Sequence, residues 1–195
     1  MEFKFKPIGI IHSPFTRNED IDARKFSDPQ GFDQIQGKLE IFKEYKRGLK
    51  DTEGFSHVMV IYVFHKSRGY KLHTKPFLDD QLRGLFSTRS PHRPNPLGLT
   101  VVRVLGREGN ILKVSGIDML EGTPILDIKP YTSRDRKSPL RLGWLGNKMK
   151  RFCDYSGVVL TVFLFIKKAG IIRFLENQPD KEEICYHNCP LILAR

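Results

Sequence analysis

A short segment of this chain places five polar side chains between and beside three prolines. Its sequence from residue 86 to residue 100 is FSTRSPHRPNPLGLT; the prolines are Pro91, Pro94 and Pro96, and the polar residues are Arg89, Ser90, His92, Arg93 and Asn95. Proline fixes φ and restrains the residue before it, so such a loop loses little entropy on binding. Guanidinium, imidazole and amide groups suit carboxylates, phosphates and base edges. The alternative is a connector whose charged residues only face water, but we predict that residues 88–98 form the functional centre, with Gly98 allowing close backbone approach.

A series of short strands must position this loop. Runs rich in β-branched and aromatic residues predict strands over 4–11, 38–42, 55–65, 99–105, 111–118 and 125–129, with a short helix over 42–49. Strands do not alternate with long helices, and no G-x-G-x-x-G follows an early strand, so a doubly wound nucleotide-binding sheet has little support. The pattern predicts a mostly β fold in which a sheet curls into a barrel.

Composition and charge limit the class of protein. The chain has 195 residues, 39% of them hydrophobic, so it can form a core. Its net charge of +11, with +7 over residues 1–137 and +4 over 138–195, favours a polyanionic partner such as nucleic acid. Three cysteines indicate a reducing compartment, and the only strong apolar run, 158–166, is too short to span a membrane. We expect a cytoplasmic protein without a signal peptide or membrane segment.

Two segments differ from the rest. Residues 17–36 are polar and predict a long loop, which in a compact domain is usually functional or disordered. From residue 138 the composition changes, so we expect a barrel domain over 1–137 and a C-terminal extension over 138–195 that packs on the barrel or on a dimer. Cys185, His187 and Cys189, with Cys153, have the residue types of a zinc site, but their spacing is unusual and we predict no metal.

Four motifs in order resemble the TrmO-like (TsaA-like) family of tRNA methyltransferases. They are the Pro-rich segment itself, IGIIHSPF over residues 8–15, EGFSHVMVIYVFHKS over 53–67 and DMLEGTPILDIKPY over 118–131. The resemblance covers roughly residues 6 to 137, and GWL at 143–145 extends it. Members of this family use S-adenosylmethionine to methylate N6 of N6-threonylcarbamoyladenosine beside the tRNA anticodon. The resemblance therefore implies this activity, with tRNA as the partner.

The resemblance also implies a single-sheeted β-barrel with short helices, acting as a homodimer. S-adenosylmethionine would lie in a crevice of the barrel near the subunit interface. Where many members have Pro-Arg-Gln in the early loop, this chain has Asp28, Pro29 and Gln30. With these three, the implied cofactor-binding residues are His65, Lys66, Arg89, Leu99, Glu121, Gly122, Thr123 and Pro124.

Methyl transfer from a sulfonium is an in-line displacement that needs alignment more than a protein nucleophile. An acceptor for the proton of the attacking nitrogen would help, and Asp118, Asp127 and His65 are the candidates. Each carboxylate could instead be a turn or cap residue, and His65 a strand-end histidine. For the substrate we predict contacts from Arg17, Arg93, Asn95 and Tyr131, with Arg134 as a further cation and Phe15, Phe86 and His92 as stacking candidates.

Two other functions stay open on the sequence. The chain could be a barrel that binds an adenosyl ligand or RNA without chemistry, because the arginine expected before Gln30 is missing. It could also methylate a different substrate.

Overall fold

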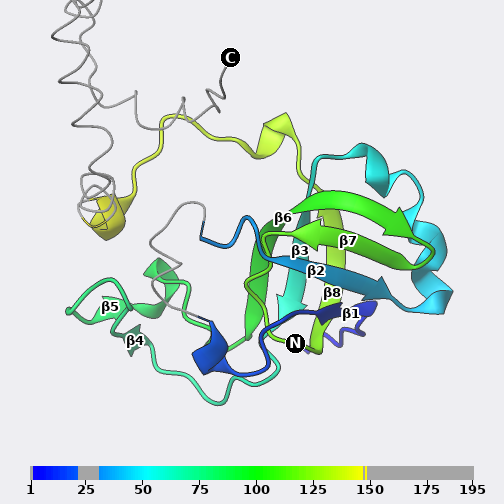
Figure 1. Ribbon diagram of the computed structural model, residues 1–195. Coiled ribbons are helices and arrows are strands. Elements are labelled where there is room, and N and C mark those ends of the chain that lie inside the picture. Colours follow the sequence, from blue (N-terminus) through cyan, green and yellow to red (C-terminus); the bar gives the residue numbers. More distant parts are fainter. Residues whose placement is uncertain (1, 22–30, 147, 149–195) are drawn as a thin grey trace, which may run out of the picture. The chain divides into compact units, whose positions relative to one another are not determined.

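The computed structural model describes residues 2–21, 31–146 and 148, and a closed antiparallel barrel dominates them (Figure 1). In order around the barrel, the strands are β1 (Gly9–His12), β2 (Gln36–Ile41), β7 (Ile111–Ser115), β6 (Leu97–Glu108), β3 (His57–Val63) and β8 (Thr123–Pro130). Strand β1 pairs with both β2 and β8, which closes the sheet. The predicted mostly β, single-sheeted barrel is confirmed.

Alternating burial explains why these segments form barrel strands. In β3, Val58, Val60 and Tyr62 are buried, whereas Met59 and the other odd-numbered residues are only half-buried and face outward. The same period of two holds in β6, where Val102 is buried between exposed neighbours. The inward residues of all six strands fill a continuous apolar core, as expected for a small closed barrel.

Short 3-10 helices connect the strands. They are η1 (Asn18–Asp20), η3 (Lys43–Leu49), η4 (Thr52–Gly54), η5 (Leu85–Ser87), η6 (Ser133–Asp135) and η7 (Gly143–Leu145). The helix predicted over 42–49 is therefore present, in the tighter 3-10 form. The observed strand ends differ from the predicted ones. The strand predicted over 4–11 begins only at Gly9, and the one predicted over 99–105 runs from Leu97 to Glu108. Pairing with β3 and β7, which propensity does not encode, sets the length of β6.

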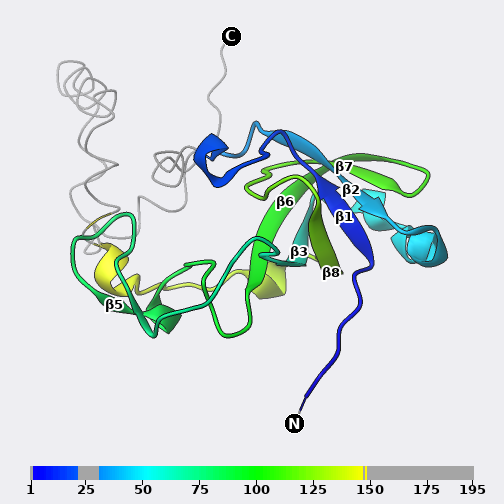
Figure 2. The same cartoon turned by 90° about the horizontal axis from the view of Figure 1, so that it is seen from below.

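Residues 66–96, here called the 66–96 lobe, connect β3 to β6. The lobe contains the short hairpin of β4 (His73–Thr74) and β5 (Arg83–Gly84). It and the η3–η4 segment project from opposite sides of the barrel in both views (Figures 1 and 2). Because Leu97 and Gly98 begin β6, the Pro-rich loop ends at Pro96, two residues earlier than predicted.

The chain divides into two units, Met1–Met149 and Lys150–Arg195. Residues of the 143–148 segment contact the 66–96 lobe: Trp144 donates from Nε1 to the carbonyl of Ser87 at 2.9 Å, and Lys148 pairs with Asp79 at 3.3 Å. The cysteines of the zinc alternative and the 158–166 run lie outside the described residues. No helix in the described part of the chain is long and apolar enough to cross a membrane.

Candidate functional site

One end of the barrel gathers most of the residues that the sequence singled out. The end of β1, the start of β2, the end of β3, the start of β6 and the start of β8 meet there, because neighbouring strands are antiparallel. The Pro-rich loop runs into the same end, since the amide of Phe64 donates to the carbonyl of Pro96 at 2.8 Å. We call this the loop end of the barrel.

His65 and Lys66 follow β3 directly at the loop end. The Nδ1 atom of His65 lies 3.4 Å from the hydroxyl of Thr123, so two of the predicted cofactor residues are neighbours. Burial, and then the charge of Lys66, lower the pKa of His65, which favours the neutral imidazole. The ammonium of Lys66 donates to the carbonyl of Thr16 at 2.7 Å and so ties the chain after β1 to the end of β3.

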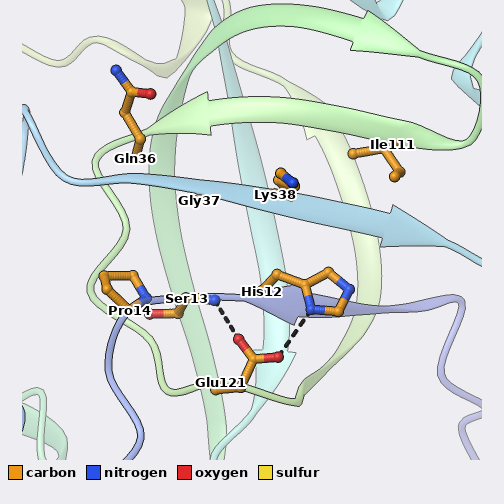
Figure 3. Close-up of a pocket in the computed structure, with 8 residues that line it drawn as sticks. All are labelled: His12, Ser13, Pro14, Gln36, Gly37, Lys38, Ile111 and Glu121. Carbon is orange, nitrogen blue, oxygen red and sulfur yellow. Dashed lines mark hydrogen bonds and ion pairs between the residues drawn. The ribbon is translucent and has the colours of Figure 1, made fainter.

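The turn over residues 121–124 is held against β1 by its first two residues. The Glu121 carboxylate accepts hydrogen bonds from the amide of Ser13 at 2.6 Å and from Nδ1 of His12 at 2.9 Å (Figure 3). Gly122 has φ +74, a conformation that favours glycine, and its amide donates to Ile11 at 2.9 Å. The Glu121 side chain is thus committed to β1, and the amides of Glu121, Gly122 and Thr123 all donate within the protein.

His12 bridges two carboxylates on the outer face of the barrel. Its Nε2 lies 2.8 Å from Glu40, opposite the contact of Nδ1 with Glu121. The hydrogen bonds to Glu40 and Glu121 raise the pKa of His12. Burial raises the pKa of Glu121, but the hydrogen bonds from Ser13 and His12 outweigh it and lower that pKa overall. The contact between His12 and Glu121 is therefore a charge-assisted hydrogen bond.

An open pocket of about 460 Å³ lies beside this pair (Figure 3). Its lining is His12, Ser13, Pro14, Gln36, Gly37, Lys38, Ile111 and Glu121. Gly37 packs against the carbonyl of His12, where an added Cβ would lie 2.6 Å from that oxygen. Only Glu121 of the predicted site residues lines this pocket, so it borders the candidate site and does not contain it.

A part-buried chain of hydrogen bonds links β3, β6 and Asp118. The Thr100 hydroxyl donates to the Asp118 carboxylate at 2.9 Å, and because that hydroxyl has one proton, Tyr62 donates to Thr100 at 3.3 Å. Burial raises the pKa of Asp118, and the nearby charge of Arg89 opposes that rise. Burial also raises the pKa of Tyr62, which keeps its hydroxyl protonated. Asp118 thus has the raised pKa that a proton acceptor needs.

Gly98 has a different role from the one expected. A Cβ at Gly98 would lie 2.3 Å from two ring carbons of Tyr62, its cross-strand partner in β3. The close approach that glycine permits is therefore to the Tyr62 ring, and the glycine positions the buried chain that ends at Asp118.

The Pro-rich loop is fixed by its own polar groups. The Ser67 hydroxyl donates to the carbonyl of Pro91 at 3.0 Å and lies 2.9 Å from Nδ1 of His92. The Arg93 guanidinium donates to the carbonyl of Thr88 at 3.0 Å and lies over the Phe86 ring, 5.7 Å from its centre. In the described part of the chain Arg89 has no such ion pair or hydrogen bond, so it is the loop cation available to an anion.

Other predicted residues lie elsewhere. Leu99 is on the outer face of the barrel, beside Ile61, and not with His65 inside the loop end. Asp127 is in the same outward row and pairs with Lys129 at 2.6 Å, so it is a weaker proton acceptor than Asp118. Tyr131 packs edge-on against His57, at the opposite end of β3 from His65.

The remaining substrate candidates have limited support. Arg17 is exposed and pairs with Asp20 at 3.4 Å. Asn95 is exposed in the loop, and its carbonyl accepts from the Leu97 amide. Phe15 is 7% exposed, so it packs in the interior and is not open for stacking. Asp28, Pro29 and Gln30 lie outside the described residues.

Sequence reasoning missed four residues of this region: His12, Glu40, Tyr62 and Thr100. His12 is part of the IHSPF motif, so its side chain could have been noticed there. Tyr62 and Thr100 lie in apolar strands, where they read as ordinary β residues. Only the pairing of β3 with β6 shows that they adjoin Asp118.

The fold and the site define a class: a closed antiparallel barrel whose polar ligand-binding groups gather at one end. The family model described as "tRNA-methyltransferase O N-terminal domain" matches residues 10–135. A probable S-adenosyl-L-methionine-binding protein of Pyrococcus abyssi is 44% identical over 89% of this chain and 94% of its own. The chain therefore belongs to the tRNA-methyltransferase O family.

Longer relatives match over part of their length. The tRNA (adenine(37)-N6)-methyltransferase of Rattus norvegicus is 40% identical over 70% of this chain and 32% of its own. The crystal structure of TrmO from Pseudomonas aeruginosa superposes with a TM-score of 0.59 and 35% identity, over 74% of this chain and 63% of that one. The chain thus spans about a third of the rat enzyme and less than two thirds of the bacterial one.

Proposed function

We propose that this protein is an S-adenosylmethionine-dependent methyltransferase that methylates N6 of N6-threonylcarbamoyladenosine next to the anticodon of tRNA. The observation that carries the proposal is the meeting of Arg89, Asp118 and the 121–124 turn at the loop end of the barrel, in a chain of the tRNA-methyltransferase O family. Relatives named as methyltransferases of adenine 37 support the position, and those named as S-adenosylmethionine-binding support the cofactor.

The residues present fit S-adenosylmethionine by their donor chemistry. Arg89 can pair with the carboxylate of its methionine part, and the turn over Gly122 can offer carbonyl oxygens, since its amides already donate within the protein. His65 and Thr123 add a neutral ring nitrogen and a hydroxyl at the same end. When bound, the cofactor supplies an electrophilic methyl group on a sulfonium.

The chain's own residues then have to orient the substrate and accept a proton. We assign the Asp118 carboxylate as the acceptor of the substrate proton, because burial raises its pKa. The hydrogen bond from the Thr100 hydroxyl orients this carboxylate. Exclusion of water falls to the rigid Pro-rich loop, which Ser67 and Arg93 fix over this end. Asp127 and His65 stay as alternatives for the acceptor.

We also propose a homodimer built on the outer face of β3 and β6. Met59, Ile61 and Val63 lie opposite Val101, Leu99 and Leu97 there, and the last three are 38%, 49% and 42% exposed. A row of paired, exposed apolar side chains is typical of an interface. Leu99 lies in this row, so a second copy on this face would bury it in the interface. A tRNA substrate and few cysteines favour the cytoplasm as the place of action.

The test is methyl transfer with isotope-labelled S-adenosylmethionine and two tRNA preparations, one carrying the threonylcarbamoyl group and one lacking it. We expect label only in the tRNA that carries the group. Cofactor binding without transfer to either tRNA would indicate a binding module, and equal transfer to both would indicate a different methylated substrate. As a check on the site, Arg89→Ala should weaken cofactor binding by tenfold or more; unchanged binding would contradict the assignment of Arg89.

A further inference from the structure

We propose that the 66–96 lobe is the surface that holds unpaired nucleotides of the RNA, by stacking bases on exposed aromatic rings inside a basic field. This inference rests on the proposed function and assigns its RNA-binding element. The family motifs in the sequence cover only the two ends of this segment, and its middle, residues 68–85, contributes nothing to the site described above.

Aromatic side chains of the lobe face solvent. Tyr70, Phe77 and Phe86 are 54%, 67% and 75% exposed, and Leu72 and Leu82 are exposed beside them. The amide of Leu85 donates to the carbonyl of Leu72, so the hairpin places residues 70–72 beside residues 85–86. Rings that could be buried but are presented to water need an occupant, and nucleobases stack on such rings without regard to sequence.

The positive charge of the lobe favours a polyanion as the molecule that binds to these rings. The lobe has seven Lys and Arg against two Asp, a net +5 in 31 residues of a chain with +11 in total. Both aspartates are neutralised within the structure, Asp79 by Arg83 at 2.6 Å and Asp80 by Lys75 at 2.9 Å. Across the described ranges, no acidic side chain pairs with Arg68 or Lys71. These cations remain available to phosphates.

Ion pairs and cation–π contacts stabilise the part of the lobe that carries the exposed rings. The buried Asp79 carboxylate accepts from Nε of Arg83 at 2.8 Å, and the pKa of Asp79 is lowered to about 2, first by its hydrogen bond with Arg83. The Arg83 guanidinium in turn lies over the Trp144 ring, 5.5 Å from its centre. Arg93 supports Phe86 from one side at 5.7 Å, which leaves the other face of the ring to a base.

The lobe adjoins the candidate cofactor site. The contact of Ser67 with His92 joins the two ends of the lobe, two residues after His65, and Arg89 belongs to both the lobe and the site. Nucleotides stacked on the lobe would therefore lie next to the loop end of the barrel. The three-dimensional arrangement thus places RNA binding and methyl transfer on neighbouring parts of one surface.

The η3–η4 segment provides a matched control surface. It also has exposed aromatic residues, Tyr45 and Phe55, but over residues 43–53 four Lys and Arg face three Asp and Glu, a net +1. It lies on the opposite side of the barrel from the lobe (Figures 1 and 2). Aromatic exposure alone therefore does not distinguish the two surfaces, whereas their charge and position do.

The experiment compares the full-length wild type with Phe86→Ala, with the double variant Tyr70→Ala and Phe77→Ala, and with the control Tyr45→Ala and Phe55→Ala. Three quantities are measured: affinity for an RNA hairpin with an unpaired loop of anticodon sequence, affinity for an RNA duplex of equal length, and affinity for S-adenosylmethionine. We expect the lobe variants to lose about tenfold or more in hairpin affinity. Affinity for the cofactor and the behaviour of the control should stay at wild-type values.

Further outcomes separate the possible errors. Hairpin affinity that is unchanged in both lobe variants overturns the inference, as does equal loss of hairpin and duplex binding. A change in oligomeric state of the lobe variants, seen by sedimentation, would assign the rings to a second copy of the chain instead. Wild type that binds the hairpin through the lobe but transfers no methyl group would overturn the proposed function alone. Arg68→Gln with Lys71→Gln tests charge without removing a ring, and should flatten the salt dependence of RNA binding by roughly two ions.

Discussion

At the scale of single residues, Asp118 differs from every other carboxylate of the site. It is largely buried and accepts from Thr100, and the raised pKa makes it a better proton acceptor than an exposed aspartate. Asp127 has the same side chain in the same motif but lies on the outer face with Lys129. The two residues therefore form a natural pair of test and control.

We expect Asp118→Asn to lower kcat about a hundredfold or more while binding of S-adenosylmethionine changes little. The acceptor must be ionised, and its pKa lies above the ordinary 3.8, so the wild-type rate should rise with pH through that raised pKa. The variant should lack this acidic limb. Single-turnover rates across pH, with calorimetry of cofactor binding, measure both. An Asp127→Asn control that lost as much activity, or an unchanged pH profile in Asp118→Asn, would contradict the role.

Gly98→Ala tests the packing under Tyr62. The added Cβ would lie 2.3 Å from the ring, so the ring or strand must move, and we expect a loss of about 1–3 kcal/mol in the free energy of unfolding. Gly48→Ala is the control, since nothing lies within 4 Å of a Cβ there. Urea unfolding of both variants decides the matter; equal stability of the two would show that the Tyr62 ring moves without cost.

The family motifs singled out His65 and Thr123, which the structure brings together at the loop end, and their role in cofactor binding stays a prediction. They did not predict which candidates are separated in space. The side chains of Leu99 and Asp127 lie on the outer face of the barrel, and Tyr131 follows the end of β8 that is opposite the loop end. Such differences follow from strand pairing, which a motif read along the chain does not contain.

At the scale of elements, the tie between β1 and the 121–124 turn depends on two titrating groups. The pKa of His12 is raised, so its stabilising contribution is complete below the ordinary 6.5 and is lost as pH rises through the higher folded-state pKa. The pKa of Glu121 is lowered, so its contribution is present above the ordinary 4.5 and is lost as pH falls. Lys38 lies on the same pocket wall.

His12→Gln keeps a hydrogen-bonding side chain but removes the charge. We expect the difference in Tm between wild type and this variant to be largest between about pH 4.5 and 6.5, and to shrink as pH rises further. Thermal unfolding at a series of pH values measures it, with His57→Gln as the control at the other end of the barrel. A difference in Tm that grew at alkaline pH would contradict the sign of this coupling.

The elements themselves were partly predictable. Runs rich in β-branched and aromatic residues located the barrel strands, because strand propensity and burial are local patterns. The β4–β5 hairpin escaped prediction, since two-residue strands leave no period to detect. The packing of the lobe around Asp79 also escaped it, because the partners Arg83 and Lys148 are distant in sequence from each other.

At the scale of the whole molecule, the outer face of β3 and β6 predicts how copies associate. Val101→Lys places a charge in the row of apolar side chains opposite Met59. If this face is the dimer interface, we expect the dimer dissociation constant to rise about thirtyfold or more, because a buried unpaired charge is costly. Affinity for S-adenosylmethionine should fall with it, because the family resemblance implies a cofactor site near the subunit interface.

Sedimentation equilibrium over a range of concentrations measures this change, and Tyr45→Lys in η3, outside the apolar row, serves as the control. A wild type that stays monomeric at micromolar concentration would show that another partner covers the face. A dimeric Val101→Lys would place the interface elsewhere. The barrel architecture itself could be predicted from many short strands, whereas which outer face stays apolar is visible only once β3 and β6 are seen to pair.

Closure of the barrel has a consequence for how the chain folds. The pairing of Gly9 with Ile125 joins the residues most distant in sequence, so we expect it to form last and the sheet to keep two free edges until then. Glu121 contacts His12 and Ser13 at that same seam, so the ligand turn takes shape only when the edges meet. An intermediate with β1 detached would expose strands prone to aggregation and would lack a formed site. Folding and the appearance of binding competence are therefore one event.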